Sequence, residues 1–236
     1  MTASVSLGDV TLIIPLAPQE RAWIKLIDDL EALPRDTEIV FVAPLELDAN
    51  VLNSFFKEAS QKIRQLSVGR KVRMIQSLTG RSVQMNAGAQ IAQKKFLFFL
   101  HADSRLSENA IDALEASIQK NPEALHYFDL EYENGTPLTL INTLGSWVGS
   151  HVLGLPTGRQ GFCISRENFE RVGKFDETLS VSGEDRAFIT KVRAAKIKLK
   201  CTDEFLQTSA RRFHEQGWLR TSSKQAWQTL RTVFRR

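Results

Sequence analysis

Short apolar runs alternate with longer segments of helical spacing through the first half of the chain. The apolar runs predict four buried strands, at residues 11–16, 38–43, 72–77 and 96–104. Apolar residues recurring every three or four positions predict helices over 19–33, 49–66 and 107–120, the last with Ser107 as its cap. Residues 80–93 have the pattern of a loop that enters a helix. Because strands that alternate with helices pair in parallel through right-handed crossovers, we expect an α/β fold with a mainly parallel central sheet flanked by helices.

The second half of the chain has a less regular pattern. Alternation and short apolar runs predict strands at 124–134 and 161–166, and one strand or two over 197–213. A helix is expected over 183–195, because its first residues are acidic and a helix N-terminus favours negative charge. Residues 138–155 are apolar but interrupted by polar side chains, which indicates a helical segment beside a pocket rather than a membrane span.

Composition and charge favour one globular domain over residues 1–236. The net charge of +4 is uneven, since residues 206–236 carry +6 and the rest of the chain carries −2. The last segment, about 215–236, has the spacing of a basic amphipathic helix. One interpretation is that its basic residues form a face exposed to solvent. The other is that the helix lies on an anionic membrane, near a lipid-linked acceptor. Nucleic-acid binding is not expected, because only this segment would support it.

Two cysteines, Cys163 and Cys201, stand outside any CxxC pair, so we interpret both as reduced packing residues. The first residues lack the basic region of a secretory signal. These features predict a cytoplasmic protein, with peripheral contact at the inner face of the membrane as the hypothesis that the basic segment adds.

Asp103 is the first candidate for chemistry. Ligands of parallel sheets bind at the carboxyl ends of strands, which here are residues 15–20, 43–48 and 101–105. A carboxylate after the strand FLFFL suits Mg²⁺ or Mn²⁺, and such a cation beside a pyrophosphate neutralises the charge of a leaving group. The alternative is that Asp103 only caps the helix that begins near Ser107.

Three further motifs carry candidate residues. In GRSVQMNAGA, Arg81 can pair with a phosphate and Asn86 with a hydroxyl, unless the small residues only pack a helix on the sheet. In GED, Glu184 or Asp185 could accept a proton from an incoming hydroxyl. In SARRF, two arginines, Arg211 and Arg212, suit a pyrophosphate or an acidic acceptor, with plain surface charge as the alternative. The sequence has no GxGxxG and no phosphate-binding P-loop.

Taken in order, these motifs resemble those of family-2 glycosyltransferases with the GT-A fold. The resemblance rests on Pro15 to Glu20, GRSVQMNAGA, FLFFLHADS, LPTGRQGFCISR, GED and SARRF. It is nearest to a small bacterial branch with His-Ala-Asp-Ser or His-Ala-Asp-Thr in place of Asp-x-Asp. It covers roughly residues 10–220 and is most specific over 80–106.

The resemblance implies a role for each matching residue. Asp103 matches the metal-binding Asp, with His101 where the first Asp usually stands, and Asp185 of the Glu184-Asp185 pair matches the general base. The remaining matches line the nucleotide-sugar site and are Glu20, Arg81, Asn86, Arg159, Gln160, Arg211 and Arg212. The implied activity is inverting transfer of a sugar from a nucleoside diphosphate sugar to an acceptor hydroxyl that the sequence does not identify, with a divalent metal as cofactor.

Two positions depart from the family pattern. Ala43 ends the second strand where the family has an Asp that contacts the base, and Arg159 stands where this branch often has Asp. These departures favour a second hypothesis, a non-catalytic nucleotide-sugar-binding relative with a degenerate site. A nucleotidyltransferase is a third, but the loop PLAPQERAW lacks the glycines that such enzymes carry there.

Overall fold

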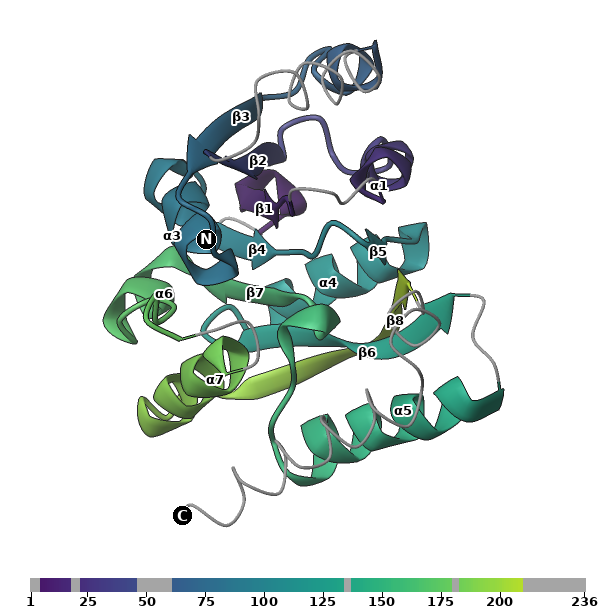
Figure 1. The fold of residues 1–236 in the computed structure, drawn as a ribbon, viewed down its shortest axis with the longest axis vertical. Coiled ribbons are helices and arrows are strands. Elements are labelled where there is room, and N and C mark those ends of the chain that lie inside the picture. The colour runs from purple at the N-terminus through teal and green to yellow at the C-terminus, as the bar shows by residue number, and fades with distance from the viewer. Residues whose placement is uncertain (1–4, 18–21, 46–60, 134–136, 180–182, 210–236) are drawn as a thin grey trace.

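The computed structural model describes residues 5–17, 22–45, 61–133, 137–179 and 183–209. Within them, eight strands form one sheet in the order β3-β2-β1-β4-β7-β6-β8-β5. The sheet is curled and helices flank it on both faces (Figure 1). The predicted α/β class is therefore confirmed.

The first half of the sheet is parallel. It comprises β1 (Val10–Pro15), β2 (Glu38–Pro44), β3 (Val72–Ser77) and β4 (Phe96–Phe99), the four strands that the apolar runs predict. Three of them, β1, β2 and β4, are buried along their whole length, which is the reason for their continuous apolar sequence. The predicted strand 96–104 is too long, because the chain turns after Phe99 and the amide of Ser104 bonds to the carbonyl of His101.

The second half of the sheet is mixed. Its strands are β5 (Ser104–Arg105), β6 (Leu125–Glu133), β7 (Phe162–Ser165) and β8 (Leu199–Ser209). Strand β7 is antiparallel to both β4 and β6, β8 is parallel to β6, and β5 is antiparallel to β8. Four of the seven strand pairings are thus parallel. The segment predicted as one strand or two is a single strand up to Ser209.

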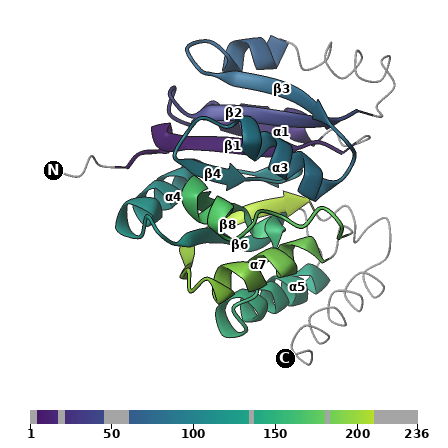
Figure 2. The same ribbon diagram turned by 90° about the vertical axis from the view of Figure 1, so that its left-hand side faces the viewer.

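The helices form a layer on each face of the sheet. Helices α1 (Trp23–Leu30) and α4 (Glu108–Lys120) cover one face, while α3 (Arg81–Ile91), α6 (Arg166–Arg171) and α7 (Glu184–Ala194) cover the other (Figures 1 and 2). Helix α5 (Pro137–Trp147) lies beside β6 and continues into a π-helical turn, η2 (Val148–Val152). Short 3-10 turns, η1 and η3, span Leu7–Asp9 and Gly158–Gln160. Of the predicted helix 49–66, only 61–66 are described, and these are helical.

Each helical layer packs its own hydrophobic core against the sheet. On the first face, Trp23 of α1 contacts Phe41 of β2, with ring centroids 5.7 Å apart. On the second face, α3, α6 and α7 pack on Ile13, Phe99 and Phe162. A Cβ at Gly88 would lie 2.5 Å from the side chain of Ile13, so this glycine lets α3 lie close to β1.

Several local predictions can be compared with this fold. Ser107 caps α4, since its hydroxyl accepts a hydrogen bond from the amide of Ala110 at 3.2 Å. Cys163 and Cys201 are both free thiols, as expected. None of the helices in the described ranges is long and apolar enough to cross a bilayer. The basic segment 215–236 lies outside the described residues.

Candidate active site

Three sequence motifs meet at one corner of the sheet. Helix α3 begins with Arg81, α7 begins with Glu184 and Asp185, and the turn after β4 carries His101 and Asp103. The Nε of Arg81 forms an ion pair with Oε1 of Glu184. Its Nη2 lies 3.6 Å from Oδ2 of Asp185, and its Nη1 lies 2.9 Å from Nε2 of His101. Arg81 therefore joins the beginnings of two helices that are a hundred residues apart in sequence to the end of β4.

The charges at this junction favour a protonated Arg81. Burial lowers the pKa of the guanidinium, but the negative charges of Asp185, Glu184 and Asp103 outweigh it, so the pKa is raised. Glu184 is only 1% exposed. Burial raises the pKa of its carboxyl, although Arg81 opposes that shift. Because Glu184 is covered by Arg81 and Asp185 is not, the two acids of the GED motif differ in their access to solvent.

Asp185 has one carboxylate oxygen without a hydrogen-bond donor. Its Oδ1 is buried and, within the part of the chain that the structure describes, receives no hydrogen bond. The oxygen lies against the backbone of Gly158, where an added Cβ would come within 2.5 Å of it. Only glycine at position 158 therefore leaves room for this carboxylate, which places η3 beside the beginning of α7.

Tyr132 is hydrogen-bonded to Arg159 and lies near Asp103. The Arg159 guanidinium donates a hydrogen bond to the phenol of Tyr132, at the end of β6. Burial raises the pKa of this phenol, Arg159 opposes the shift, and the nearby charge of Asp103 adds to it. Arg159 thus lies on the side of the cluster near Asp103, and its guanidinium is hydrogen-bonded to the Tyr132 phenol.

Other predicted binding residues are engaged inside the protein. The amide of Gln160 donates to the carbonyl of Phe128 at 2.9 Å and accepts from the amide of Thr157 at 2.9 Å, which fixes η3. Asn86 donates to the carbonyl of Phe175 at 3.0 Å and accepts from its amide at 3.2 Å. The side chains of Asn86 and Gln160 therefore hold loops of the protein in place.

Gln84 has a similar holding role that the sequence analysis missed. Its buried amide donates to the carbonyl of Leu16, after β1, and to that of Val42, in β2, at 2.8 Å each. The polar residues of GRSVQMNAGA hence connect the ends of neighbouring strands. The signal in the sequence is a glutamine between two apolar residues, Val83 and Met85, inside a helix.

Three predicted site residues, Glu20, Arg211 and Arg212, lie outside the described residues. Among the described ones, Arg81, Asp103, Arg159, Glu184 and Asp185 gather in the cluster. The sequence analysis missed Tyr132 and the part that Gly158 plays. Alternation along residues 124–134 could have indicated that Tyr132 shares a strand face with Phe128 and Leu130.

Asp103 is the residue here that suits a divalent cation. It is half-buried in the turn between β4 and β5 and offers carboxylate oxygen, the donor that Mg²⁺ and Mn²⁺ prefer. His101 is already engaged by Arg81. A cation at Asp103 would therefore draw most of its ligands from a bound diphosphate and water, and a single carboxylate fits that arrangement.

A separate cleft lies between α1, β5 and β8. It has a volume of about 440 Å³ and is lined by Asp29, Arg105, Leu106, Ser107, Glu131, Glu204, Phe205 and Gln207. Arg105 forms two hydrogen bonds of 2.6 Å with Asp29 across it. Because none of the candidate residues lines this cleft, we place the active site at the Arg81 junction.

Comparison with solved structures identifies the fold. The mannosyltransferase PcManGT from Pyrobaculum calidifontis, in complex with GDP-Man and Mn²⁺, matches with a TM-score of 0.68 and 16% identity, over 97% of this chain and 64% of that one. S. aureus TarS 1–349 matches with a TM-score of 0.64 and 15% identity, over 85% of this chain and 60% of that one. The chain has the GT-A fold. The complex of S. aureus TarS 1–349 with UDP-GlcNAc matches with a TM-score of 0.62 and 16% identity, over 85% of this chain and 58% of that one.

The resemblance to these glycosyltransferases is one of structure. The chain spans about 60% of the length of the TarS 1–349 chain. No protein-family model matches the sequence, and comparison with curated protein sequences gives no match. At 15–16% identity the similarity shows the fold, and the chemistry has to be argued from the site.

Proposed function

We propose that this protein is a family-2-like, inverting glycosyltransferase that moves a sugar from a nucleoside diphosphate sugar to an acceptor hydroxyl. The observation that carries the proposal is the junction at Arg81, which brings GRSVQMNAGA, HADS and GED together. These are three of the motifs on which the resemblance to that family rests. Two relatives of similar fold are in complex with GDP-Man or UDP-GlcNAc, which supports a donor of this class.

Asp185 is the proposed general base. Its side chain is 16% exposed, so an acceptor hydroxyl can approach the carboxylate from solvent. Removing the hydroxyl proton makes its oxygen a better nucleophile toward the anomeric carbon. The Arg81 guanidinium lies 3.6 Å from Oδ2 of Asp185 and helps to hold this carboxylate in place.

Glu184 is proposed as a positioning residue. The GED motif makes Glu184, like Asp185, a candidate to accept the proton of the acceptor, but its carboxylate is buried beneath Arg81 and does not face solvent. The ion pair fixes the guanidinium, which in turn faces both Asp185 and Asp103. Because Glu184 already pairs with the guanidinium, Arg81 would act on a donor diphosphate through its positive charge rather than through two parallel hydrogen bonds.

Asp103 would hold the divalent cation, Mg²⁺ or Mn²⁺. When bound, such a cation neutralises the charge that develops on the departing nucleoside diphosphate. Asp103 supplies carboxylate oxygen at the end of β4, where ligands of such sheets bind. PcManGT in complex with GDP-Man and Mn²⁺ supports the choice of metal.

The rest of the donor site is proposed from the resemblance. Arg159 and Tyr132 would face the diphosphate or sugar near Asp103, while Asn86 and Gln160 shape the site by holding its loops. Further contacts are proposed for Glu20, Arg211 and Arg212. The basic segment 215–236 would make peripheral contact with the inner face of the membrane, in a cytoplasmic protein of bacterial type.

Thermal unfolding with nucleoside diphosphates and their sugars, with and without Mn²⁺, tests the donor site. A donor at 100 times its Kd stabilises the folded state by about 2.7 kcal/mol, so one nucleotide series should raise the Tm, and more so with Mn²⁺. Asp103→Asn should remove the effect of Mn²⁺ while leaving the Tm of the free protein nearly unchanged. If no nucleotide or nucleotide sugar changes the Tm, the proposal is contradicted.

The second candidate function is a non-catalytic nucleotide-sugar-binding protein. Ala43, at the end of β2, and Arg159 favour it, because both replace acids that the family has near the donor. This candidate would be supported if the protein binds a nucleotide sugar normally but transfers no sugar to any of a panel of hydroxyl acceptors. Release of nucleoside diphosphate that depends on Asp185 would exclude it.

A further inference from the structure

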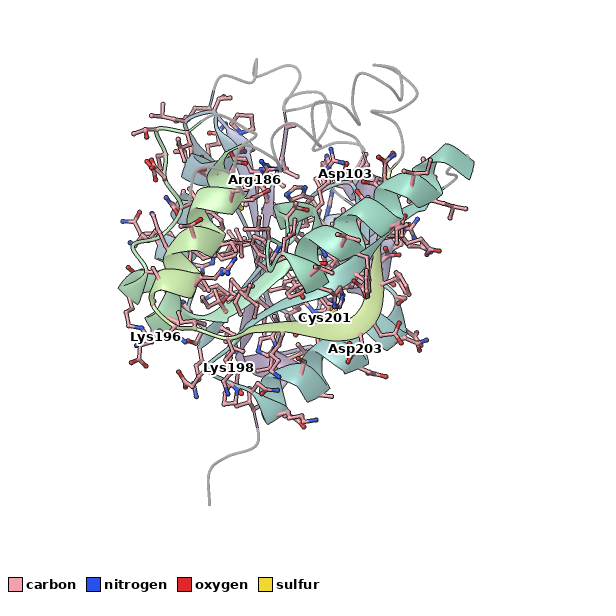
Figure 3. The ribbon with its side chains drawn as sticks, turned by 90° about the horizontal axis from the view of Figure 1, so that it is seen from below. Asp103, Arg186, Lys196, Lys198, Cys201 and Asp203 are labelled. Carbon is pink, nitrogen blue, oxygen red and sulfur yellow. The ribbon has the colours of Figure 1, made fainter. Side chains whose placement is uncertain are left out.

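Away from the Asp103 corner, three side chains of different chemistry converge between α5 and the end of the sheet. They are Asp129 on β6, His151 in η2 and Cys201 on β8, and their ligand atoms all lie within 4.8 Å of one another. Figure 3 labels Cys201 and Asp103, which lie well apart in that view. The two clusters are therefore separate features of the fold.

Two irregularities of the backbone bring this cluster together. His151 lies in a π-helical turn, which shifts its side chain from the position an α-helix would give it. Between Tyr127 and Asp129 the register with β8 shifts, since Tyr127 pairs with Cys201 but Asp129 pairs with Phe205. The extra residues on β8 include Asp203, whose φ of 61° is unusual for a residue other than glycine. Such π-turns and bulges are frequent at functional sites.

The contacts within the cluster place the carboxylate in the centre. Oδ1 of Asp129 lies 2.9 Å from Nε2 of His151, and the thiol of Cys201 donates a hydrogen bond to the same carboxylate. The indole of Trp147 stacks on the imidazole at 5.0 Å between ring centroids and an angle of 23°, which orients His151. A thiol hydrogen-bonded to a carboxylate is not activated as a nucleophile, because the neighbouring negative charge disfavours the thiolate.

We propose that Asp129, His151 and Cys201 form a binding site for a divalent cation of the zinc class. One carboxylate, one imidazole and one thiolate are the three ligand types that proteins offer to Zn²⁺, and three protein ligands leave a fourth position for water. Binding replaces the hydrogen bonds of the metal-free cluster: the thiol proton goes to solvent, and the sulfur, the carboxylate and an imidazole nitrogen each donate a lone pair to the cation. The His151 side chain is 25% exposed, so a cation can enter from solvent.

The proposed cation is distinct from the one at Asp103. A soft thiolate favours Zn²⁺ or Co²⁺ over Mg²⁺, whereas the lone carboxylate of Asp103 is a ligand for hard cations. The cluster does not depend on glycosyl transfer, because its three residues lie outside the Arg81 junction. The two proposals can therefore fail separately.

Titration of the chelator-stripped full chain with Co²⁺ tests the site, because Co²⁺ bound by a cysteine gives a thiolate-to-metal charge-transfer band. We expect one equivalent of Co²⁺ to produce that band and tetrahedral visible bands, and Zn²⁺ to displace it. Cys201→Ser should abolish the charge-transfer band. His151→Ala should weaken Co²⁺ binding by more than about 100-fold, since loss of a partner outside the coordination shell alone costs about 10–100-fold.

A matched control and a check on folding complete the experiment. Glu204→Gln changes a carboxylate on the same strand, in the other cleft, and should leave the band intact. Circular dichroism verifies that each variant is folded, and Asp129→Asn replaces Cys201→Ser if the latter does not fold. The proposal is overturned if the wild type gives no thiolate band at stoichiometric Co²⁺, or if the band survives in a folded Cys201→Ser variant.

Discussion

The two halves of the sheet differ in regularity and in what they contribute. The parallel half, β3-β2-β1-β4, is evenly paired, buried in all its strands except β3, and flanked by α1 and α3. The mixed half, β7-β6-β8-β5, contains a register shift, and beside it η2 is a π-helical turn and η3 a tight 3-10 turn. The parallel half supplies Arg81 and Asp103, whereas the mixed half supplies Asp185, Tyr132 and Arg159.

The two halves therefore contribute to the candidate site in different ways. Regular strands and helix N-termini provide fixed charges at predictable places, because their geometry follows from the hydrophobic pattern. Irregular segments aim single side chains in directions that a regular element cannot reach. The candidate active site lies where the two halves meet, and the Arg81–Glu184 ion pair is their polar connection there. Four single substitutions, with their controls, test what the two halves contribute.

The largest effect is expected for Asp185→Asn, which removes the base that the mixed half supplies. Turnover should fall by about 10²–10⁴-fold, the usual contribution of a general base, while donor binding changes little. The amide is nearly isosteric, so the Tm should stay close to that of the wild type. Steady-state rates and thermal unfolding measure the two quantities, and full activity in this variant would exclude Asp185 as the base.

Arg81→Met should weaken the connection between the two halves and so destabilise the protein. The methionine keeps the packing of the side-chain stem but leaves the buried Glu184 carboxylate without its partner, which costs about 3–5 kcal/mol of unfolding free energy. Urea denaturation measures this loss. Because the unpaired carboxyl has its folded pKa raised further, the loss should increase as the pH rises.

The double variant Arg81→Met with Glu184→Met is the control for that measurement. Replacing a buried ion pair by apolar residues of similar volume is often neutral for stability, so the double variant should regain much of what the single variant loses. A double variant no more stable than Arg81→Met would show that the pair does not couple the halves.

His126→Gln tests the acid stability of the mixed half. His126 of β6 is fully buried and hydrogen-bonded to Ser117, and burial lowers the pKa of its imidazole to about 4 from 6.5. The unfolded chain therefore takes up this proton first, and stability is lost as the pH falls from about 6.5 to 4. The full contribution is about 3 kcal/mol. The variant should show a flatter stability profile across this window, and an unchanged slope would contradict the assignment.

Ser107→Ala should have the smallest effect, because it alters a local element of the chain. Loss of the hydroxyl that caps α4 costs about 1 kcal/mol in typical helices. Thermal unfolding should show a small decrease in Tm with unchanged donor binding. Ser107→Asp, which keeps an oxygen acceptor at the cap, should restore the stability.

Prediction from sequence succeeded where one physical rule decides the outcome. The bounds of β3, the cap at Ser107 and the helix that begins at Glu184 follow from hydrophobic period and terminal chemistry. The length of β4 was wrong, since an apolar run does not show where a chain turns, and the turn is closed by a backbone bond at His101. Tyr132 was missed because its partners, Arg159 and Asp103, are distant in sequence.

The hydrophobic pattern determined the α/β class and the order of the first strands along the chain, and the polar residues between them marked the motifs that carry candidate chemistry. These are local properties, because a side chain's period and its immediate neighbours fix them. Only the tertiary structure decided that Glu184 is buried against Arg81 while Asp185 keeps a free oxygen facing Gly158, among the described residues. It alone decided that Asp129, His151 and Cys201 meet. Burial and distance between separate segments depend on how whole layers pack, and no single segment encodes that packing.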